Sequence, residues 1–413
     1  MAALEGIRVL DFGRYVAGPY CAALLADFGA DVIRIEPLGG GDDRGLAPVT
    51  GEGEGAVFLQ GNRNKRSLAL NPRGVQGREV VRRLVATADV VIVNVPESAL
   101  AGMGLDYESL AAIRPDIVLT NISSFGPEGP WSDRPGFDSV GQAMCGSAWL
   151  TGTGEVPFRS PVTWVDNATG VYAAFGTMVA LFERARTGRG QKVGASLLAT
   201  ALAVSSSYLI EQAATGKNRV ATGNRGGLNG PTDGFRTKDG WIVTQVVGQA
   251  IFRRLATLID EPGWLEDPRF ANDNLRGENG AVLSERMARW CAERTSTEAL
   301  DALAGANVPA GPVLSPADAL GHPQVTAMGM FQEVDVAGSQ VPVPLLKSAV
   351  TLGATPGEIR TRPPRAGEHT AEILEEIGFG AQEIQALLGD GVVSRPEDPH
   401  GQIEVRTMDK PSP

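Results

Sequence analysis

The chain of 413 residues contains few cysteines, few histidines and no long apolar run. Its three cysteines, Cys21, Cys145 and Cys291, cannot pair evenly and share no metal-ligand spacing, which argues against a disulfide framework and against a bound metal. No uninterrupted apolar run reaches the roughly 18 residues of a membrane span, and no charged-then-apolar leader opens the chain. We therefore expect a cytoplasmic protein with no metal and no membrane partner.

Basic residues are also in the minority. Lysine and arginine total 37 against 48 aspartates and glutamates, which gives a formal net charge of −11. This balance argues against nonspecific binding to nucleic acid or to an anionic membrane surface. A composition with 43% hydrophobic and 21% charged residues fits a globular protein with more than one domain. A phosphate-bearing ligand would need a local basic pocket.

Short apolar strands alternate with helices through the N-terminal part of the chain. The pattern predicts strands over 7–10, 31–35, 90–93 and 117–122, and helices over 19–28, 74–86 and 107–112. Such alternation predicts a mostly parallel sheet covered by helices on both faces. The loop from Asp11 to Gly18 lacks the Gly-x-Gly-x-x-Gly spacing of a dinucleotide fingerprint, so NAD is poorly supported as a ligand.

Basic residues gather where the predicted strands end. Arg14 lies in the first loop, Arg34 near the end of the second strand, and several more basic residues lie between Gly61 and Arg73. Ligands of open α/β sheets bind outside the carboxyl ends of the strands, so these residues could hold a phosphate-rich anion. The alternative is a solvated basic loop.

A stretch from Trp164 to Leu198 combines a lone carboxylate with a helix of small residues. Asp166 is placed as a helix N-cap, the helix is predicted over 167–186, and Gly188 is placed to end it. Backbone N–H groups and the helix dipole would then favour the ionised carboxylate, a usable nucleophile. The alternative is a capping aspartate with a purely structural role. The apolar stretch over 193–210 is interpreted as a further helix.

A second region follows with its own pattern. Residues 234–244 are typical of a β-hairpin with its turn at 238–240, and helices are predicted over 250–258, 283–293 and 297–303. Thr295 and Glu298 have the spacing of a capping box at the start of the last of these helices. This region is therefore predicted to be a small α/β domain.

Seven separated motifs carry a resemblance to a known family. They are Leu4–Asp11, Ala30–Pro37, Asn64–Leu68, Ser124–Pro130, Gly136–Gln142, the segment from Asp166 through Thr187-Gly-Arg-Gly-Gln191, and Gly305–Pro312. From Leu4 to about Val393 the chain resembles the class III CoA-transferases of the CaiB/BaiF group, which includes formyl-CoA:oxalate CoA-transferase. The resemblance implies an α/β fold with a Rossmann-like large domain and an interlocked homodimer.

The resemblance also implies a domain layout. A large CoA-binding domain would cover 1–205, a linker with a glycine-rich loop 206–230, and a small α/β domain 231–325. A return segment over 326–393 would complete the large domain, and a polar, proline-containing tail over 394–413 is predicted to be disordered.

By the same resemblance, Asp166 is the covalent nucleophile. Its carboxylate would attack an acyl-CoA thioester to give an anhydride, then carry CoA as an aspartyl thioester to an acceptor acid. Expected CoA contacts are Tyr15, Val16, Ala17, Arg34, Leu68, Asn71, Arg73 and Arg134. The expected acceptor and oxyanion residues are Gln142, Arg225, Gly226 and Gly227. One departure is the segment Val93–Ser98, where many relatives carry a basic CoA contact.

Three alternatives to intermolecular CoA transfer remain open. An intramolecular transferase acting on one diacid would use the same residues. An α-methylacyl-CoA racemase is disfavoured, because Phe137 occupies the place of a proton-exchanging histidine and cannot exchange a proton. A CoA-binding protein without turnover would have no need of Asp166. The substrates are an acyl-CoA and a small carboxylic acid whose identities the sequence does not specify.

Overall fold

A computed structural model describes residues 2–396, and the chain divides into two compact units. Among these residues, the first unit contains 2–138, 163–200 and 330–396, and the second contains 139–162 and 201–329. Apart from its first three positions, the tail predicted to be disordered lies outside the described residues. Within the described part of the chain, no helix combines the length and apolarity that a membrane crossing requires.

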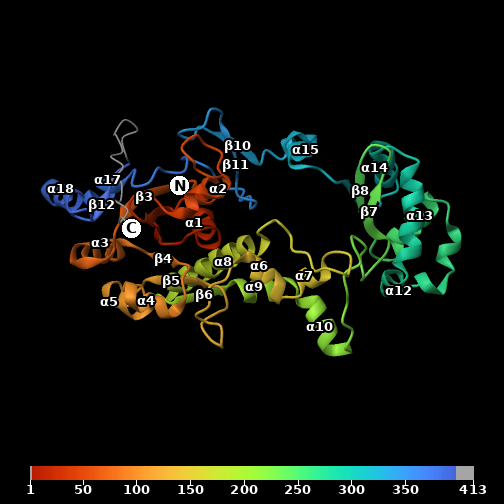
Figure 1. The fold of residues 1–413 in the computed structure, drawn as a ribbon, viewed down its shortest axis with the longest axis horizontal. Coiled ribbons are helices and arrows are strands. Elements are labelled where there is room, and N and C mark those ends of the chain that lie inside the picture. The colour runs from red at the N-terminus through yellow and green to blue at the C-terminus, as the bar shows by residue number, and fades with distance from the viewer. Residues whose placement is uncertain (1, 397–413) are drawn as a thin grey trace, which may run out of the picture. The chain divides into compact units, whose positions relative to one another are not determined.

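The first unit is built on a seven-stranded sheet with the order β12-β3-β2-β1-β4-β5-β6 (Figure 1). Its strands are β1 (Arg8–Asp11), β2 (Asp31–Glu36), β3 (Lys65–Leu70), β4 (Val90–Val93), β5 (Val118–Ser123), β6 (Lys192–Ser196) and β12 (Val393–Ser394). All neighbours are parallel except β12, which runs antiparallel to β3. The predicted α/β fold with a mostly parallel sheet is confirmed. The strand order reverses between β1 and β4, where open α/β sheets bind their ligands.

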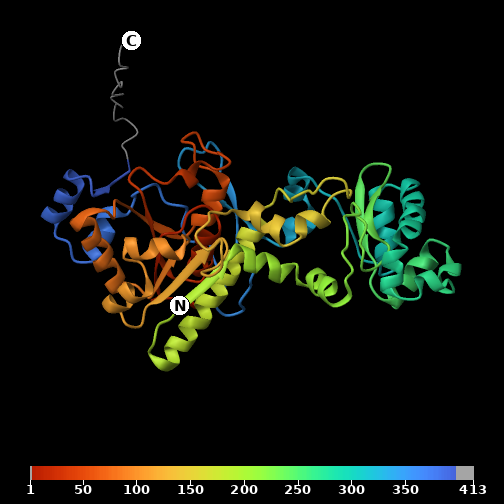
Figure 2. The same ribbon diagram turned by 60° about the horizontal axis from the view of Figure 1, so that its bottom comes forward.

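Helices cover both faces of this sheet (Figures 1 and 2). Apolar side chains from one face pack with those of α3, α4, α5, α17 and α18 in one large core, while α1 and α8 lie together over the other face. The bounds are α1 (Ala17–Asp27), α3 (Gly74–Thr87), α4 (Glu97–Met103), α5 (Tyr107–Ile113), α8 (Trp164–Thr187), α17 (Thr370–Glu376) and α18 (Ala381–Gly389). The burial of both faces explains why a central strand such as β4 consists of apolar residues alone.

The small residues of α8 allow a close approach to α1. A Cβ atom added to Gly170 would lie 2.9 Å from the carbonyl oxygen of Ala17 and 3.1 Å from the ring of Tyr20. Thr177, farther along α8, shares a 2.6 Å hydrogen bond with Thr120 of β5. These contacts hold α8 against α1 and against strand β5.

Smaller elements complete the first unit. They are a 3-10 turn η1 (Asp42–Gly45), α2 (Ala56–Asn62), and an antiparallel pair of strands, β10 (Phe331–Val334) and β11 (Val343–Leu346). Phe58 and Leu59 of α2 pack with Val336, Leu345 and Ile359 in a separate apolar cluster. Of the four points at which the chain passes between the units, two lie within helices, α6 (Asp138–Met144) and α9 (Leu197–Val204).

One predicted helix is partly wrong. Residues 193–196 belong to strand β6, which pairs in parallel with β5, and helices follow only from Leu197. The segment Lys192–Ser196 is short and has only one buried residue, so its local pattern carries little signal. Its hydrogen bonds to β5 decide its conformation, and these depend on tertiary structure.

The second unit contains a three-stranded antiparallel sheet in the order β7-β8-β9. Its strands are β7 (Thr232–Arg236), β8 (Trp241–Gln245) and β9 (Ala310–Pro312). Its helices are α7 (Ser147–Leu150), α10 (Ser206–Thr215), α11 (Gln249–Leu258), η2 (Pro262–Leu265), η3 (Pro268–Phe270), α12 (Asp273–Glu278), α13 (Gly280–Ala292), α14 (Ser296–Gly305), α15 (Pro316–Gly321) and α16 (Pro323–Ala327). The hairpin and the capping box of Thr295 and Glu298 are confirmed.

Candidate active site

Asp166 lies in the first turn of α8, two residues after the helix begins. The N-cap residue of α8 is Thr163, so the prediction that Asp166 itself is the N-cap is wrong. The C-terminal prediction is confirmed, because Gly188 ends the helix in the left-handed conformation at φ 69°. Asp166 is 8% exposed.

Asp138 supplies the cap that Asp166 does not. Its Oδ2 atom accepts hydrogen bonds from the backbone N–H groups of Val165 at 2.7 Å and Asp166 at 3.1 Å. Asp138 is 3% exposed and begins α6. A carboxylate at this place satisfies free N–H groups at the positive end of the helix dipole. The Gly-Phe-Asp motif at 136–138 contains this residue, but nothing in the motif itself indicates a cap for a helix that begins 26 residues later.

The environment raises the pKa of Asp166 to about 7, first through burial and second through the nearby charge of Asp138. The expectation that the helix N-terminus would favour its ionised form is therefore wrong. Burial penalises the charged form of a carboxyl, and a neighbouring carboxylate adds to that penalty. A pKa near neutrality is useful for catalysis, because such a carboxylate is more basic than an exposed one and yet substantially ionised at neutral pH.

The Asp166 cavity has a volume of about 250 Å³ and lies at the carboxyl ends of the strands. It is lined by the loops after β1, β4 and β5, by residues 133–137 and by Leu197. Of the predicted site residues, it brings together Asp166, Tyr15, Val16, Ala17 and Arg134. The rings of Tyr15 and Phe137 meet edge to face in its lining, with centroids 5.5 Å apart.

A larger cavity of about 840 Å³ lies in the same unit. Predicted CoA contacts Arg34, Asn71 and Arg73 line it, together with Arg14 and Arg78. Arg14 lines both cavities. Arg78, which no sequence motif singled out, lies one turn into α3. Leu68, also a predicted contact, is fully buried in the apolar core and is not among the lining residues of either cavity.

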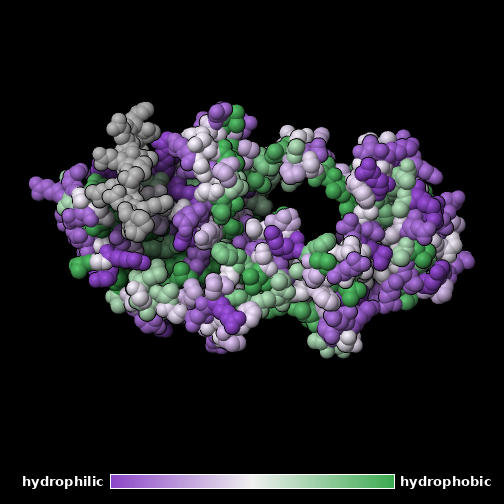
Figure 3. Space-filling model, viewed as in Figure 1, coloured by the Kyte–Doolittle hydropathy of each residue, from purple (hydrophilic) through white to green (hydrophobic). Residues whose placement is uncertain are grey.

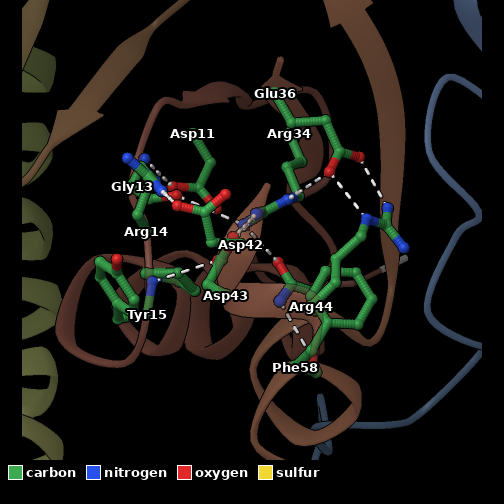
Figure 4. A network of polar contacts seen from close by, with 12 residues as sticks. Asp11, Gly13, Arg14, Tyr15, Arg34, Glu36, Asp42, Asp43, Arg44 and Phe58 are labelled. Carbon is green, nitrogen blue, oxygen red and sulfur yellow. Dashed lines mark hydrogen bonds and ion pairs between the residues drawn. The ribbon is translucent and has the colours of Figure 1, made fainter. Parts of the chain in front are cut away.

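Arg34 borders the larger cavity but is 1% exposed. Its guanidinium donates to Asp43 at 2.8 and 3.0 Å, to Asn62 at 3.1 Å and to the carbonyl of Gly13 at 3.3 Å (Figure 4). The carboxylate of Glu36 lies 3.4 Å from its Nε atom. Because these donors are engaged inside the protein, the geometry does not support the predicted phosphate contact by Arg34.

Other basic residues of the predicted cluster also form internal ion pairs. Lys65 pairs with Asp11 at 2.7 Å and Arg63 with Asp27 at 2.6 Å, both buried. Arg73, by contrast, has an exposed side chain at the larger cavity. The basic side chains that a ligand in the larger cavity can contact are therefore those of Arg14, Arg73 and Arg78.

The segment that lacks the usual basic residue contributes an asparagine instead. Asn94 accepts a hydrogen bond from the backbone N–H of Arg14 at 2.9 Å and donates one to its carbonyl at 2.7 Å. Asn94 also lines the Asp166 cavity. The segment after β4 thus fixes the loop after β1.

The remaining predicted residues belong to the second unit. Gln142 is buried and exchanges hydrogen bonds with the backbone of Ser160, at 2.8 Å for the bond that it accepts. Gly226 donates to the carbonyl of Thr232 at 2.7 Å, and the carbonyl of Gly227 accepts from Arg219 at 2.5 Å. Arg225 is partly exposed. Their participation in a site with Asp166 stays a prediction.

The fold and cavities define an α/β protein with a buried carboxyl and a basic cavity at one sheet edge. Within residues 2–396, no group of three or more His, Cys, Asp or Glu side chains is arranged to hold a metal ion. Carboxylate nucleophiles form covalent acyl intermediates, and arginines bind phosphate groups. The arrangement suits acyl transfer from an anionic, phosphate-bearing donor.

Comparison with known proteins gives the family. Residues 4–370 match CoA-transferase family III. The chain is 34% identical over 398 residues to the succinyl-CoA–D-citramalate CoA-transferase of Chloroflexus aurantiacus, covering 94% of this chain and 98% of that protein. It is 33% identical over 407 residues to the succinyl-CoA:glutarate CoA-transferase of Mus musculus, covering 96% and 92%. The chain therefore belongs to CoA-transferase family III.

A solved structure supports the same assignment. The CaiB/BaiF family protein from Brucella suis has a TM-score of 0.79 and 35% sequence identity, over 91% of this chain and 99% of that chain. The resemblance drawn from the sequence motifs is confirmed. The protein is an enzyme that moves CoA between an acyl-CoA and a carboxylic acid.

Proposed function

We propose that Asp166 is the nucleophile of CoA transfer. An Asp166 oxygen attacks the thioester carbonyl, the carbon–sulfur bond breaks, and CoA leaves as the thiolate from a mixed anhydride. The thiolate then attacks the Asp166 carbonyl and releases the donor acid, which leaves an aspartyl-CoA thioester. The second half of the cycle runs the same two steps in reverse. The acceptor carboxylate attacks the aspartyl-CoA thioester and releases the CoA thiolate, which then attacks the acceptor carbonyl and frees Asp166. No net proton is consumed. Anhydride and thioester are both activated, which keeps the steps similar in energy.

One observation carries this proposal. Asp166 combines burial, a position in the lining of a cavity at the sheet edge, and a pKa raised to about 7. A dry site favours a carboxylate nucleophile, because water would hydrolyse the anhydride. Asp138 occupies the helix N–H groups, so Asp166 has no capping bond to lose when it attacks.

The two cavities suggest how acyl-CoA binds. The larger one, with Arg73 and Arg78, would take the phosphate-bearing end of CoA, and the smaller one would take the thioester beside Asp166. Arg14 borders both cavities, so it is suited to contact the part of acyl-CoA that extends from one cavity to the other. Asn71 and Arg134 are further proposed contacts.

We propose that the acids exchanged are short dicarboxylic acids. The relatives from Chloroflexus aurantiacus and Mus musculus are named for succinyl-CoA with D-citramalate and with glutarate. Arg225 is a candidate partner for the second carboxylate, with Gln142, Gly226 and Gly227 near the acceptor. Intramolecular transfer within one diacid would use the same nucleophile and is distinguished by whether CoA reaches a labelled free acid.

We also propose a homodimer in the cytoplasm. Along α8, Val171, Tyr172, Phe175, Met178, Val179 and Phe182 are 39–68% exposed at intervals that place them on one helix face. A continuous apolar stripe of this kind marks an interaction surface. Figure 3 shows one face of the molecule, where hydrophobic residues lie at the surface among hydrophilic ones. The interlocked arrangement comes from the family resemblance.

Hydroxylamine trapping tests the proposed intermediates. Hydroxylamine converts an aspartyl thioester or anhydride to a hydroxamate, which peptide mass spectrometry locates. Incubation with a panel of dicarboxylyl-CoA donors should give a donor-dependent hydroxamate at Asp166, and Asp166→Asn should give none. A hydroxamate at another residue in the wild-type enzyme would refute the assignment.

A further inference from the structure

The loop after β1 adopts a conformation that its sequence alone would not select. Tyr15 has φ 64°, in the left-handed region. That region is unfavourable for a bulky residue, which stays there only when its surroundings hold it. The conformation of this loop shapes both cavities, because Tyr15 lines the Asp166 cavity and Arg14 lines both.

Side chains from the adjoining strand β1 and from more distant parts of the first unit hold the backbone of this loop. Asp11 accepts from the N–H of Gly13 at 2.8 Å, and Asn94 binds both backbone groups of Arg14. Arg34 donates to the Gly13 carbonyl at 3.3 Å, and Asp43 accepts from the N–H of Tyr15 at 3.1 Å. Arg34 and Asp43 thus bind the loop on either side of Arg14.

Arg34 and Asp43 also bind each other. The Nη2 atom of Arg34 lies 2.8 Å from Oδ2 and 3.0 Å from Oδ1 of Asp43, and both side chains are 1% exposed (Figure 4). The Oδ2 atom is the one that accepts from Tyr15. A single carboxylate oxygen therefore joins the buried arginine to the left-handed residue. Removing one partner of such a pair leaves a buried charge uncompensated.

We infer that Arg34 and Asp43 are positioning residues for CoA transfer, which hold the loop from Gly13 to Tyr15 so that it shapes the thioester cavity. Neither residue contacts the substrate. The Arg34 guanidinium has Asp43 and Glu36 beside it, and these carboxylates would repel a phosphate placed there. The inference rests on the proposed placement of the thioester beside Asp166.

A kinetic comparison separates this role from direct phosphate binding. Asp43→Asn weakens the acceptor shared by Arg34 and Tyr15, and Arg34→Lys cannot reach all of its partners with one ammonium. Each variant is assayed with an acyl-CoA and with the corresponding acyl-pantetheine, which lacks every phosphate. Because two conservative variants are tested, the comparison of the two substrates can be made even if only one of the variants folds.

The buried pair Arg63 and Asp27 is the matched control. It has the same exposure, 1% for each side chain, and a similar distance of 2.6 Å. Neither residue lines the two cavities or binds the loop backbone. Asp27→Asn and Arg63→Lys report the loss of stability that follows from weakening a buried ion pair, without a change at the loop.

A positioning role predicts a loss of kcat/KM of roughly 10- to 100-fold for Asp43→Asn and Arg34→Lys, equal for both substrates. The double variant should lose little more than either single one, because both act through one loop. The control variants should keep wild-type kcat/KM at a temperature where all are folded. A loss in Arg34→Lys confined to the phosphate-bearing substrate, or equal losses in the controls, would overturn the inference.

These outcomes stay separate from those of the Asp166 proposal. CoA transfer is the measured quantity here, whereas the hydroxamate reports the residue that is acylated. Failure to label Asp166 would refute the nucleophile even if the loop variants behaved as expected.

Discussion

The carboxylate of Asp138 accepts a hydrogen bond at 3.1 Å from the backbone N–H of Asp166, the residue whose own carboxyl it perturbs. One acidic residue therefore both caps α8 and raises the pKa of its neighbour. The bond to Val165 at 2.7 Å completes the cap. The position and the acidity of the proposed nucleophile are thus coupled through Asp138.

Asp138→Asn should uncouple these two effects. The asparagine Oδ1 atom can still accept from the helix N–H groups, but the negative charge is gone, so the pKa of Asp166 falls. If ionised Asp166 attacks the thioester, kcat/KM rises with pH through the pKa of about 7 in the wild type. The midpoint should move to lower pH in the variant.

The pH profile of kcat/KM for a fixed acyl-CoA measures this shift. Asp390→Asn, which removes a carboxylate at the end of α18, should leave the midpoint in place. A midpoint unchanged in Asp138→Asn would contradict the proposed coupling.

The raised pKa of Asp166 also predicts a pH dependence of stability. Because its folded pKa of about 7 lies above the ordinary value of 3.8, the folded state holds a proton that the unfolded state has lost between these pH values. This contribution is fully present below about pH 4 and is lost as pH rises through about 7. The change is on the order of 1.4 kcal/mol per pH unit within that window.

Urea unfolding of the wild type and Asp166→Asn across this window measures the contribution. The unfolding free energy of the wild type minus that of the variant should fall as pH rises. The wild type loses the stabilising proton at this position, whereas the variant has no proton to lose there. A pH-independent difference would show that the carboxyl keeps its ordinary pKa.

Arg73 and Arg78 are expected to bind the phosphate-bearing end of CoA. Replacing either by alanine should raise the KM for acyl-CoA roughly 10- to 100-fold, the range of a hydrogen bond to a charged group, with little change in kcat. The effect should vanish with acyl-pantetheine. Arg82→Ala is the matched control, because Arg82 lies on the same helix, pairs with Glu79 and lines neither cavity. Equal effects in Arg82→Ala would contradict the assignment.

The apolar stripe on α8 is expected to lie in the homodimer interface. Replacing Phe175 and Phe182, which are 66% and 68% exposed, by glutamate would bury two charges in that interface and should produce monomers. Sedimentation velocity measures the change. Val75→Glu, at an apolar residue of α3 that is 78% exposed and lies off the stripe, should leave the dimer intact. Dimers that persist in the double variant would place the interface elsewhere.

Local patterns predicted much of the fold. The α8 helix and its end at Gly188 follow from neighbouring residues, as does the hairpin around 238–240. Strand β6 could not be predicted in this way, because its conformation depends on pairing with β5. The sequence motifs also indicated the family correctly.

The site depended more on contacts between distant residues. Asp138 reaches α8 from 28 residues away along the chain, so the sequence suggested the wrong cap for that helix. Arg34 lies near the end of strand β2, where a phosphate contact is reasonable, but its partner Asp43 lies in the η1 turn. Such pairings decide whether a basic residue faces a ligand or the protein interior, and no local pattern encodes them.

The most direct test of the central claim follows oxygen through one catalytic cycle. An acceptor acid labelled with oxygen-18 in its carboxylate should leave one labelled oxygen on the enzyme each time its acyl group accepts CoA. We predict that peptide mass spectrometry of the wild-type enzyme finds this label on Asp166, and only when an acyl-CoA donor is present. Product formation with the label absent from Asp166, or found on another residue, would contradict the assignment of Asp166 as the nucleophile.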